Sequence, residues 1–229
     1  MKKISKMGEL AWLLGTILCG FGVVLCTKAN FGLSMFAAPP YILHVVLVKL
    51  FPWYTQGTSE YIWQLLLLAV LCLLVMRFRL KYLMAYAVAI LFGLVIDGWI
   101  FVFGGSEPFS TIPGRICAFA LGELTISASV AMVFRSYMPP QIPECLVMEV
   151  AQRYGKSMAG VKQITDLTCL ALSFVLSLVL TGGFTGVGIG TVIFTLCNAS
   201  LIRLWGKVLD RYFTFEPAFP KWKSWLDKC

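Results

Sequence analysis

The stretch "GLSMFAAPPYILH", residues 32–44, follows the first long apolar run and determines how often the chain crosses a membrane. It is too apolar for a surface loop, yet it holds Pro39, Pro40 and the only histidine, His44. A helix that begins at prolines, enters a membrane and returns needs protein or a water-filled cavity around its unpaired backbone groups. We therefore expect residues 35–51 to be re-entrant or buried between spans. The alternative is an ordinary short span with a proline near its start.

The composition is that of a membrane protein. Hydrophobic residues make up 59% of the 229 residues, charged residues 13%, and the mean hydropathy is +0.84, which is more apolar surface than a soluble domain of this length could bury. The net charge of +8 does not indicate nucleic-acid binding, because the basic residues form short blocks between apolar runs. Six runs reach the roughly 20 residues that a spanning helix needs: 10–28, 59–77, 82–104, 114–135, 164–182 and 187–206.

The basic residues predict the orientation of these spans. If residues 35–51 do not cross, 16 of the 19 Lys and Arg residues fall on one side, and only Lys28, Lys49 and Arg115 on the other. If they do cross, "RFRLK" at 77–81 changes sides and the bias weakens. Because cytoplasmic loops collect Lys and Arg, we expect a multi-pass membrane protein with both termini cytoplasmic.

The order of the segments suggests an internal repeat. An offset of about 106 residues brings "ANFGLSMFAAPPYIL" over "RSYMPPQIPECLVME" and Glu60 over Asp166. Each half has three crossings, so the second half would be inverted in the membrane relative to the first, as in many secondary transporters. We expect an all-α bundle of six transmembrane helices in one domain, residues 1–229. It would be a 3+3 inverted repeat, about 10–104 and 114–206, with two short re-entrant or broken helices and an interfacial cytoplasmic tail at 207–229.

Carboxylates within the apolar segments are the first candidates for a site, because an ionisable group in a membrane normally has a partner or a task. Glu123 lies deepest, roughly 8 residues into its run. It could couple transport to protons, or be protonated and hydrogen-bond a neighbouring helix. Asp97, in "GLVIDGW", is either a coupling residue or an interfacial acid. Glu60 and Asp166 begin spans, where a helix dipole alone would favour them.

Four further side chains complete the candidate set. Glu144 lies in the second proline-led segment, Gln64 is one turn after Glu60, and Asn198 is near the middle of the last span. A buried amide suits either helix cross-linking or recognition of a neutral polar ligand. His44 could carry a proton or simply pack. The eight cysteines form no C-x-x-C pair, so we expect no metal and no cofactor.

The segment "VLTGGFTGVGIGTVIF", together with "KANFGLS", "GLVID" and "PECLVMEVAQRYGKS" in that order, resembles the YczE/YitT-like family of bacterial integral membrane proteins. The resemblance implies a six-helix inner-membrane protein with two related halves. Met35 departs from it, since the family has a proline after "GLS". The second-half Pro-Arg-Asp element is also absent, and Glu144 is the acid nearest its place.

These features favour a secondary transporter or substrate-binding carrier for a small molecule, with or without coupling to protons. The excess of membrane carboxylates favours a neutral or cationic ligand. The alternatives are the membrane-embedded binding subunit of a vitamin-type importer and a non-transporting regulatory protein. An enzyme is not expected, because one histidine supports no H-E-x-x-H motif and no Ser-His-Asp or Cys-His arrangement. Partners would be the lipid bilayer, the unknown ligand and, in a homo-oligomer, a second copy of the chain.

Overall fold

The computed structural model describes residues 4–104, 109 and 111–219. Within them the chain is almost entirely helical, with one pair of short parallel strands that brings Ile4 opposite Phe213. The elements in order are β1 (Ile4–Met7), α1 (Gly8–Ala29), α2 (Ala38–Leu47), α3 (Gln56–Val75), α4 (Leu80–Phe103), α5 (Ile112–Val133), α6 (Ile142–Tyr154), α7 (Met158–Thr181), α8 (Ile189–Tyr212) and β2 (Phe213–Glu216).

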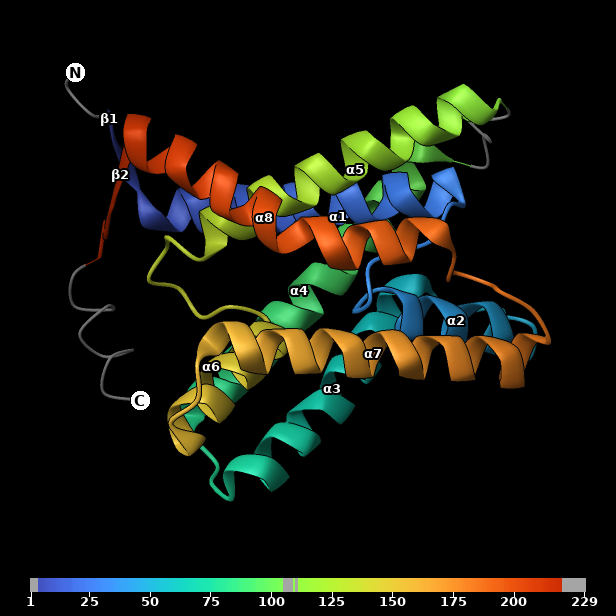
Figure 1. Ribbon diagram of the computed structural model, residues 1–229, viewed down its shortest axis with the longest axis horizontal. Coiled ribbons are helices and arrows are strands. Elements are labelled where there is room, and N and C mark those ends of the chain that lie inside the picture. Colours follow the sequence, from blue (N-terminus) through green and yellow to red (C-terminus); the bar gives the residue numbers. More distant parts are fainter. Residues whose placement is uncertain (1–3, 105–108, 110, 220–229) are drawn as a thin grey trace.

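Six helices are long and apolar enough to cross a membrane, which confirms the predicted number of spans: α1, α3, α4, α5, α7 and α8. They run between two ends of the molecule (Figure 1). We call the end that carries β1 and β2 the strand end, and the other the opposite end. The two strands place the beginning of α1 and the end of α8 at the same end.

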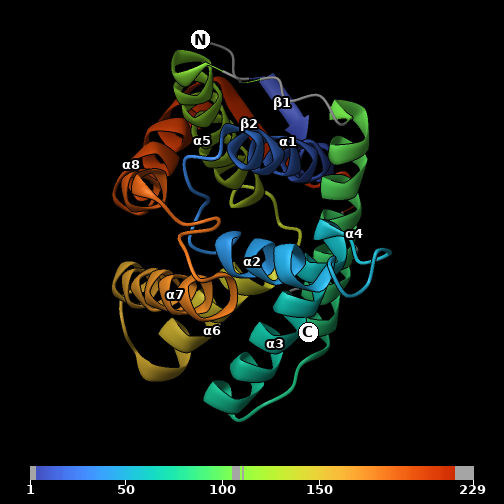
Figure 2. The same ribbon diagram turned by 90° about the vertical axis from the view of Figure 1, so that its right-hand side faces the viewer.

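The helices form two layers joined at one edge. Figure 2 shows α1, α5 and α8 in one layer and α2, α3, α6 and α7 in the other, with α4 extending along both. The contacts agree with this view: α5 packs on α1 and α8, α3 packs on α2 and α6, and α4 packs on both α1 and α3.

The two short helices each begin at prolines. Pro39 and Pro40 lie in the first turn of α2, and Pro143 in the first turn of α6, where the missing N–H needs no partner. The 10 residues of α2 span about 15 Å, half the roughly 30 Å of a hydrocarbon core. Because α1 ends and α3 begins at the opposite end (Figure 1), the segment between them, which contains α2, starts and finishes on the same side of the molecule.

The most extensive contact between two helices is that of α1 and α5. A Cβ atom placed on Gly22 would lie 2.8 Å from the carbonyl oxygen of Gly122, and one placed on Gly122 would lie 2.9 Å from that of Gly22. Gly15 is equally confined, with Ser129 O at 3.0 Å from its Cβ position. Small residues at such a crossing let two backbones approach within a membrane.

A second glycine contact joins α3 to α4. A Cβ atom on Gly57 would lie 2.2 Å from Gly93 O, and the Asp97 carboxylate accepts hydrogen bonds from Thr55 Oγ1 at 2.7 Å and Gly57 N at 2.8 Å. Between the last two helices there is no comparable contact in the described chain, and α7 and α8 barely touch. One edge of the molecule is therefore tightly closed and the other is loosely packed.

Some boundaries differ from those expected. Helix α7 begins at Met158 rather than at residue 164, because the Ser157 side chain caps it by accepting a hydrogen bond from Gly160 N. Helix α8 continues to Tyr212 instead of ending at 206, so the expected tail is in part helix. The β1–β2 pair was not expected, since its partners are far apart in sequence. Residues 220–229 of that tail lie outside the described residues.

Replacing Gly22 by Leu should destabilise the protein by about 1–3 kcal/mol, because the added atoms have no space against the α5 backbone. Gly98→Leu is the matched control, since nothing lies within 4 Å of a Cβ placed there on α4. Thermal unfolding in detergent should show a lower Tm for the Gly22 variant only. Equal Tm values for both variants and the wild type would show that the α1–α5 contact is not tight.

Candidate functional site

A central cavity of about 90 Å³ lies between the two layers. Side chains of α1, α3, α4, α5, α6, α7 and α8 line it, together with the segment that leads into α2. Most of the lining is apolar, as is usual for small-molecule sites. The exceptions are eight polar or charged side chains: Thr16, Ser34, Glu60, Ser129, Gln141, Glu144, Lys162 and Asn198.

On one wall of the cavity, Glu60 and Gln64 form a buried pair one turn apart on α3. Gln64 Nε2 lies 3.4 Å from Glu60 Oε1 and 3.0 Å from Gln141 Oε1. Gln64 Oε1 in turn accepts a hydrogen bond from the backbone N–H of Ile142 at 3.3 Å. One buried amide therefore satisfies the first turn of α6 and fixes the position of Glu60 beside it.

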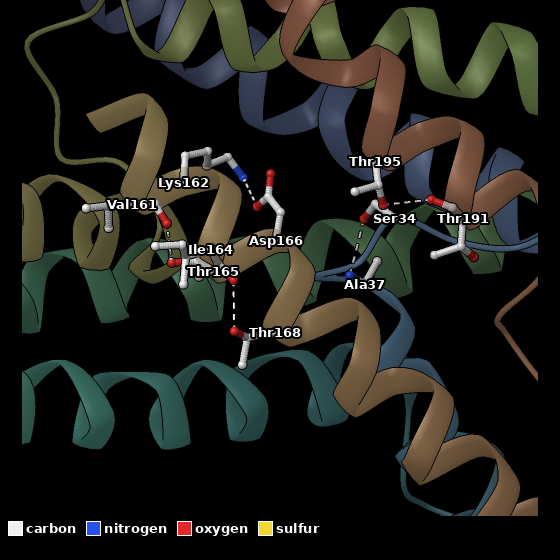
Figure 3. Close-up of polar contacts among 10 residues, drawn as sticks. All are labelled: Ser34, Ala37, Val161, Lys162, Ile164, Thr165, Asp166, Thr168, Thr191 and Thr195. Carbon is white, nitrogen blue, oxygen red and sulfur yellow. Dashed lines mark hydrogen bonds and ion pairs between the residues drawn. The ribbon is translucent and has the colours of Figure 1, made fainter. Parts of the chain in front are cut away.

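On the facing wall, Lys162 and Asp166 form an ion pair one turn apart on α7. Lys162 Nζ lies 2.6 Å from Asp166 Oδ1 and 4.3 Å from the centre of the Phe36 ring, just before α2. Figure 3 shows this pair on the side of α7 toward Ser34, whose hydroxyl accepts a hydrogen bond from Ala37 N at 3.2 Å. Lys162 is thus held between its own helix and the entry to α2.

The charges of the cavity do not balance. Glu60, Glu144 and Asp166 bring three carboxyl groups, whereas Lys162 brings one ammonium group. Lys162 also attracts Glu144 electrostatically. Glu144 itself forms no ion pair within the described residues. Because unpaired buried charges are costly, protons or a bound cation must neutralise part of this group.

Asn198 brings an unsatisfied acceptor to the same cavity. Its side chain lies on α8 and is 8% exposed. Its Oδ1 has no hydrogen-bond partner in the described part of the chain. Because buried polar atoms in proteins are nearly always paired, this oxygen indicates a place for water or for a donor group of a ligand.

Three of the predicted site residues lie elsewhere. Glu123 is 6% exposed, and its Oε1 has no partner among the described residues, but it does not line the cavity. Asp97 caps α3, as shown above. His44 lies on α2 with its ring stacked 6.5 Å from that of Tyr54, away from the cavity lining. The cavity therefore collects Glu60, Glu144 and Asn198 directly, while Gln64 and Asp166 hold the groups that line it.

Sequence reasoning missed the basic partner. Lys162 was counted with the cytoplasmic basic residues, because it lies just before the expected start of its span. Its spacing of one turn from Asp166 was the available signal. Gln141 and Ser34 were also missed, since their roles depend on contacts that no sequence pattern carries.

A second cavity of about 420 Å³ lies at the strand end. Val133 and Phe134 line both cavities, so they separate the two. The rest of its wall includes the segment Ser136–Pro140, Met148 and Met158. No group of three or more potential metal ligands occurs within the described residues.

Glu149 joins α6 to the beginning of α4 at the same end. Its carboxylate accepts a hydrogen bond from Tyr82 Oη at 2.7 Å, is bonded by Lys81 Nζ, and lies 3.5 Å from Arg79 Nη1. Burial alone would raise the pKa of Glu149, but the hydrogen bonds from Lys81 and Tyr82 and the charges of Lys81 and Arg79 lower it below its ordinary value. This network fixes α6 against the beginning of α4.

The chain belongs to a family of unknown function, DUF6198, which matches residues 7–207. The match includes every helix except the end of α8. No curated protein and no solved structure matches the chain. The family description does not name the YczE/YitT-like proteins, so that resemblance stays a prediction.

Glu149→Gln should destabilise the protein at neutral pH by about 1–3 kcal/mol, because it leaves Lys81 and Arg79 without their buried partner. Since the folded-state pKa of Glu149 is lowered, its contribution is present above the ordinary value of 4.5 and is lost as the pH falls through the folded-state value. The Tm difference between wild type and variant should shrink accordingly below pH 4.5.

Asp210→Asn is the matched control for this titration. It removes the acid of an exposed ion pair, Arg135–Asp210, and such pairs contribute about 0–1 kcal/mol. A Tm difference for Glu149→Gln that is no larger than that of the control, or that does not change with pH, would contradict the role of the network.

Proposed function

We propose that this protein is a secondary transporter or substrate-binding carrier for a small neutral or cationic molecule, coupled to protons through Glu60 and Glu144. The central cavity carries the proposal, because it combines an excess of carboxyl groups with the unpartnered amide oxygen of Asn198. Both features suit a ligand that donates hydrogen bonds or bears positive charge.

The arrangement of the helices supports an inverted repeat. Each half runs long helix, short helix, long helix, long helix: α1–α4 and then α5–α8. The contacts between helices also correspond in the two halves. Helix α1 packs on α4 as α5 packs on α8, and α3 of the first half packs on α6 of the second as α7 of the second half packs on α2 of the first. The reciprocal contact of Gly22 with Gly122 lies where a twofold axis between the halves would pass. In transporters of this plan, interrupted helices from both halves form the substrate site.

The caps of α3 and α7 give the register of this repeat. Thr55 and Ser157 are the two N-caps, and Glu60 and Lys162 follow them at the same distance. The buried pair Glu60–Gln64 then corresponds to the ion pair Lys162–Asp166, rather than Glu60 to Asp166 as the sequence offset suggested. In this register the cavity receives one acidic and one basic residue from equivalent positions of the two halves.

We further propose that the halves alternate between an open and a closed arrangement. The α3–α4 edge is fixed by Gly57, Gly93 and Asp97, whereas α7 and α8 barely touch and are free to change their separation. The thin partition of Val133 and Phe134 between the two cavities marks a path toward the strand end. Protonation of Glu60 or Glu144 would remove the charge that holds a cation and so release it.

The strand end would face the cytoplasm of a bacterial cell. It carries the basic residues of the α3–α4 turn and of the α6–α7 region, whereas Lys28, Lys49 and Arg115 lie near the opposite end. This distribution follows the rule that cytoplasmic loops are rich in Lys and Arg.

The function can be tested by thermal-shift screening of the purified protein against small amines, polyols and amino acids. A compound that binds in the cavity should raise the Tm of the wild type and of Glu123→Gln, a buried acid outside the cavity. It should have little effect on Glu60→Gln or Asn198→Ala. In proteoliposomes, a pH gradient should drive uptake of the same compound at least about tenfold faster for the wild type than for Glu60→Gln, which cannot change its charge.

Two outcomes would reject the proposal. One is stabilisation that persists in both cavity variants but disappears in Glu123→Gln, which would place the ligand elsewhere. The other is binding in the cavity without any uptake in proteoliposomes, which would leave a binding or regulatory protein in place of a carrier.

A further inference from the structure

A third cavity lies at the strand end, next to the second cavity, with which it shares Glu149. It has a volume of about 200 Å³ and is bounded by the end of α3, the turn into α4, and α6. Its lining residues are Val75, Arg77, Arg79, Glu149, Gln152 and Arg153, none of which lines the central cavity. We call it the arginine pocket.

The walls of the arginine pocket are held in place by two local features. Met76 adopts a left-handed conformation with φ 54°, which ends α3 and directs the chain sideways into Arg77. Tyr154, at the end of α6, donates a hydrogen bond from its hydroxyl to Leu74 O of α3 at 2.9 Å. This bond keeps the last turns of α3 and α6 together, so Arg77 and Arg153 stay on facing walls.

The pocket has a positive charge that the protein itself does not neutralise. Its one acid, Glu149, is already shared by Lys81, Tyr82 and Arg79. Arg77 and Arg153 are exposed, and neither forms an ion pair within the described residues. Guanidinium groups bind phosphate oxygens in pairs of parallel hydrogen bonds, and Gln152 adds an amide donor at the same wall.

The surroundings of the pocket favour a lipid over a free phosphate ion. Leu73, Met76 and Phe78 flank it in sequence and are 72%, 76% and 62% exposed, which suits contact with acyl chains. The pocket therefore opens at the level where the apolar surface of α3 ends and the charged face begins. We propose that the arginine pocket binds the phosphate headgroup of an anionic phospholipid, with the acyl chains lying along α3.

The proposal is tested by native mass spectrometry and thermal shift of the full chain in neutral detergent, with phosphatidylglycerol as the probe. The wild type should bind the lipid and gain Tm. The double variant Arg77→Gln/Arg153→Gln should bind it roughly twenty-five-fold more weakly, at roughly fivefold for each basic residue near an anionic headgroup. Phosphatidylcholine and inorganic phosphate at equal concentration should leave the Tm of the wild type unchanged.

The matched control is Arg203→Gln together with Lys207→Gln. It removes two exposed basic residues from the part of α8 that is nearest the strand end. This variant should bind phosphatidylglycerol as the wild type does. Binding that falls equally in both double variants would show attraction by net charge alone and overturn the site. Stabilisation of the wild type by inorganic phosphate as strong as that by the lipid would overturn the choice of a lipid.

Discussion

The backbones of α1 and α5 meet at Gly22 and Gly122, and the rest of the structure depends on this contact. A Cβ atom on either residue would come within 3 Å of the carbonyl oxygen of the other, so a larger side chain at either position would push α1 and α5 apart. Arg115 ties the opposite end of the same pair by donating to Ala29 O at 2.7 Å. Near the strand end, Trp12 of α1 donates to Pro139 O, in the connection between α5 and α6, at 3.2 Å. With the central pair fixed, the segment before α2 and the first turn of α6 reach the cavity from opposite ends.

The cavity holds charged side chains between the membrane-spanning helices, where an ionisable group is costly and normally has a partner or a task. Lys162 is partly neutralised by Asp166 and lies over the Phe36 ring. Within the described part of the chain, the side chain of Glu60 is bonded only by the amide of Gln64. Under the proposed function, a proton or a cation would relieve the excess of carboxyl groups at this site. Lys162 lies on α7, which forms one side of the loosely packed edge between α7 and α8.

The sequence predicted those features that arise from local pattern. Apolar length predicted six spans, and the prolines at 39, 40 and 143 predicted the short helices. The sequence also named three groups that line the cavity, each for its own reason: Glu60 for its place at the start of a span, Glu144 for its place in the second proline-led segment, and Asn198 for its depth in the last span. It did not predict the positions of Glu123 and Asp97 outside the cavity, because a helix depth says nothing of which neighbour a face meets. Asp97 caps a helix that begins about 40 residues earlier in the chain, a contact made only in the folded protein. Lys162 was missed because the rule that cytoplasmic loops are rich in Lys and Arg assigns it to a loop. In the structure it forms an ion pair with Asp166 at the cavity.

In the proposed transport cycle, the entries to α2 and α6, from opposite sides of the membrane, reach one cavity that opens to both sides in turn. Single cysteines in place of Ser34 and Gln141, in a protein whose eight native cysteines are replaced, can be labelled with a membrane-impermeant maleimide from each face. The account predicts that each position is labelled from both faces. Labelling of residue 34 only from the opposite end, and of residue 141 only from the strand end, would contradict it.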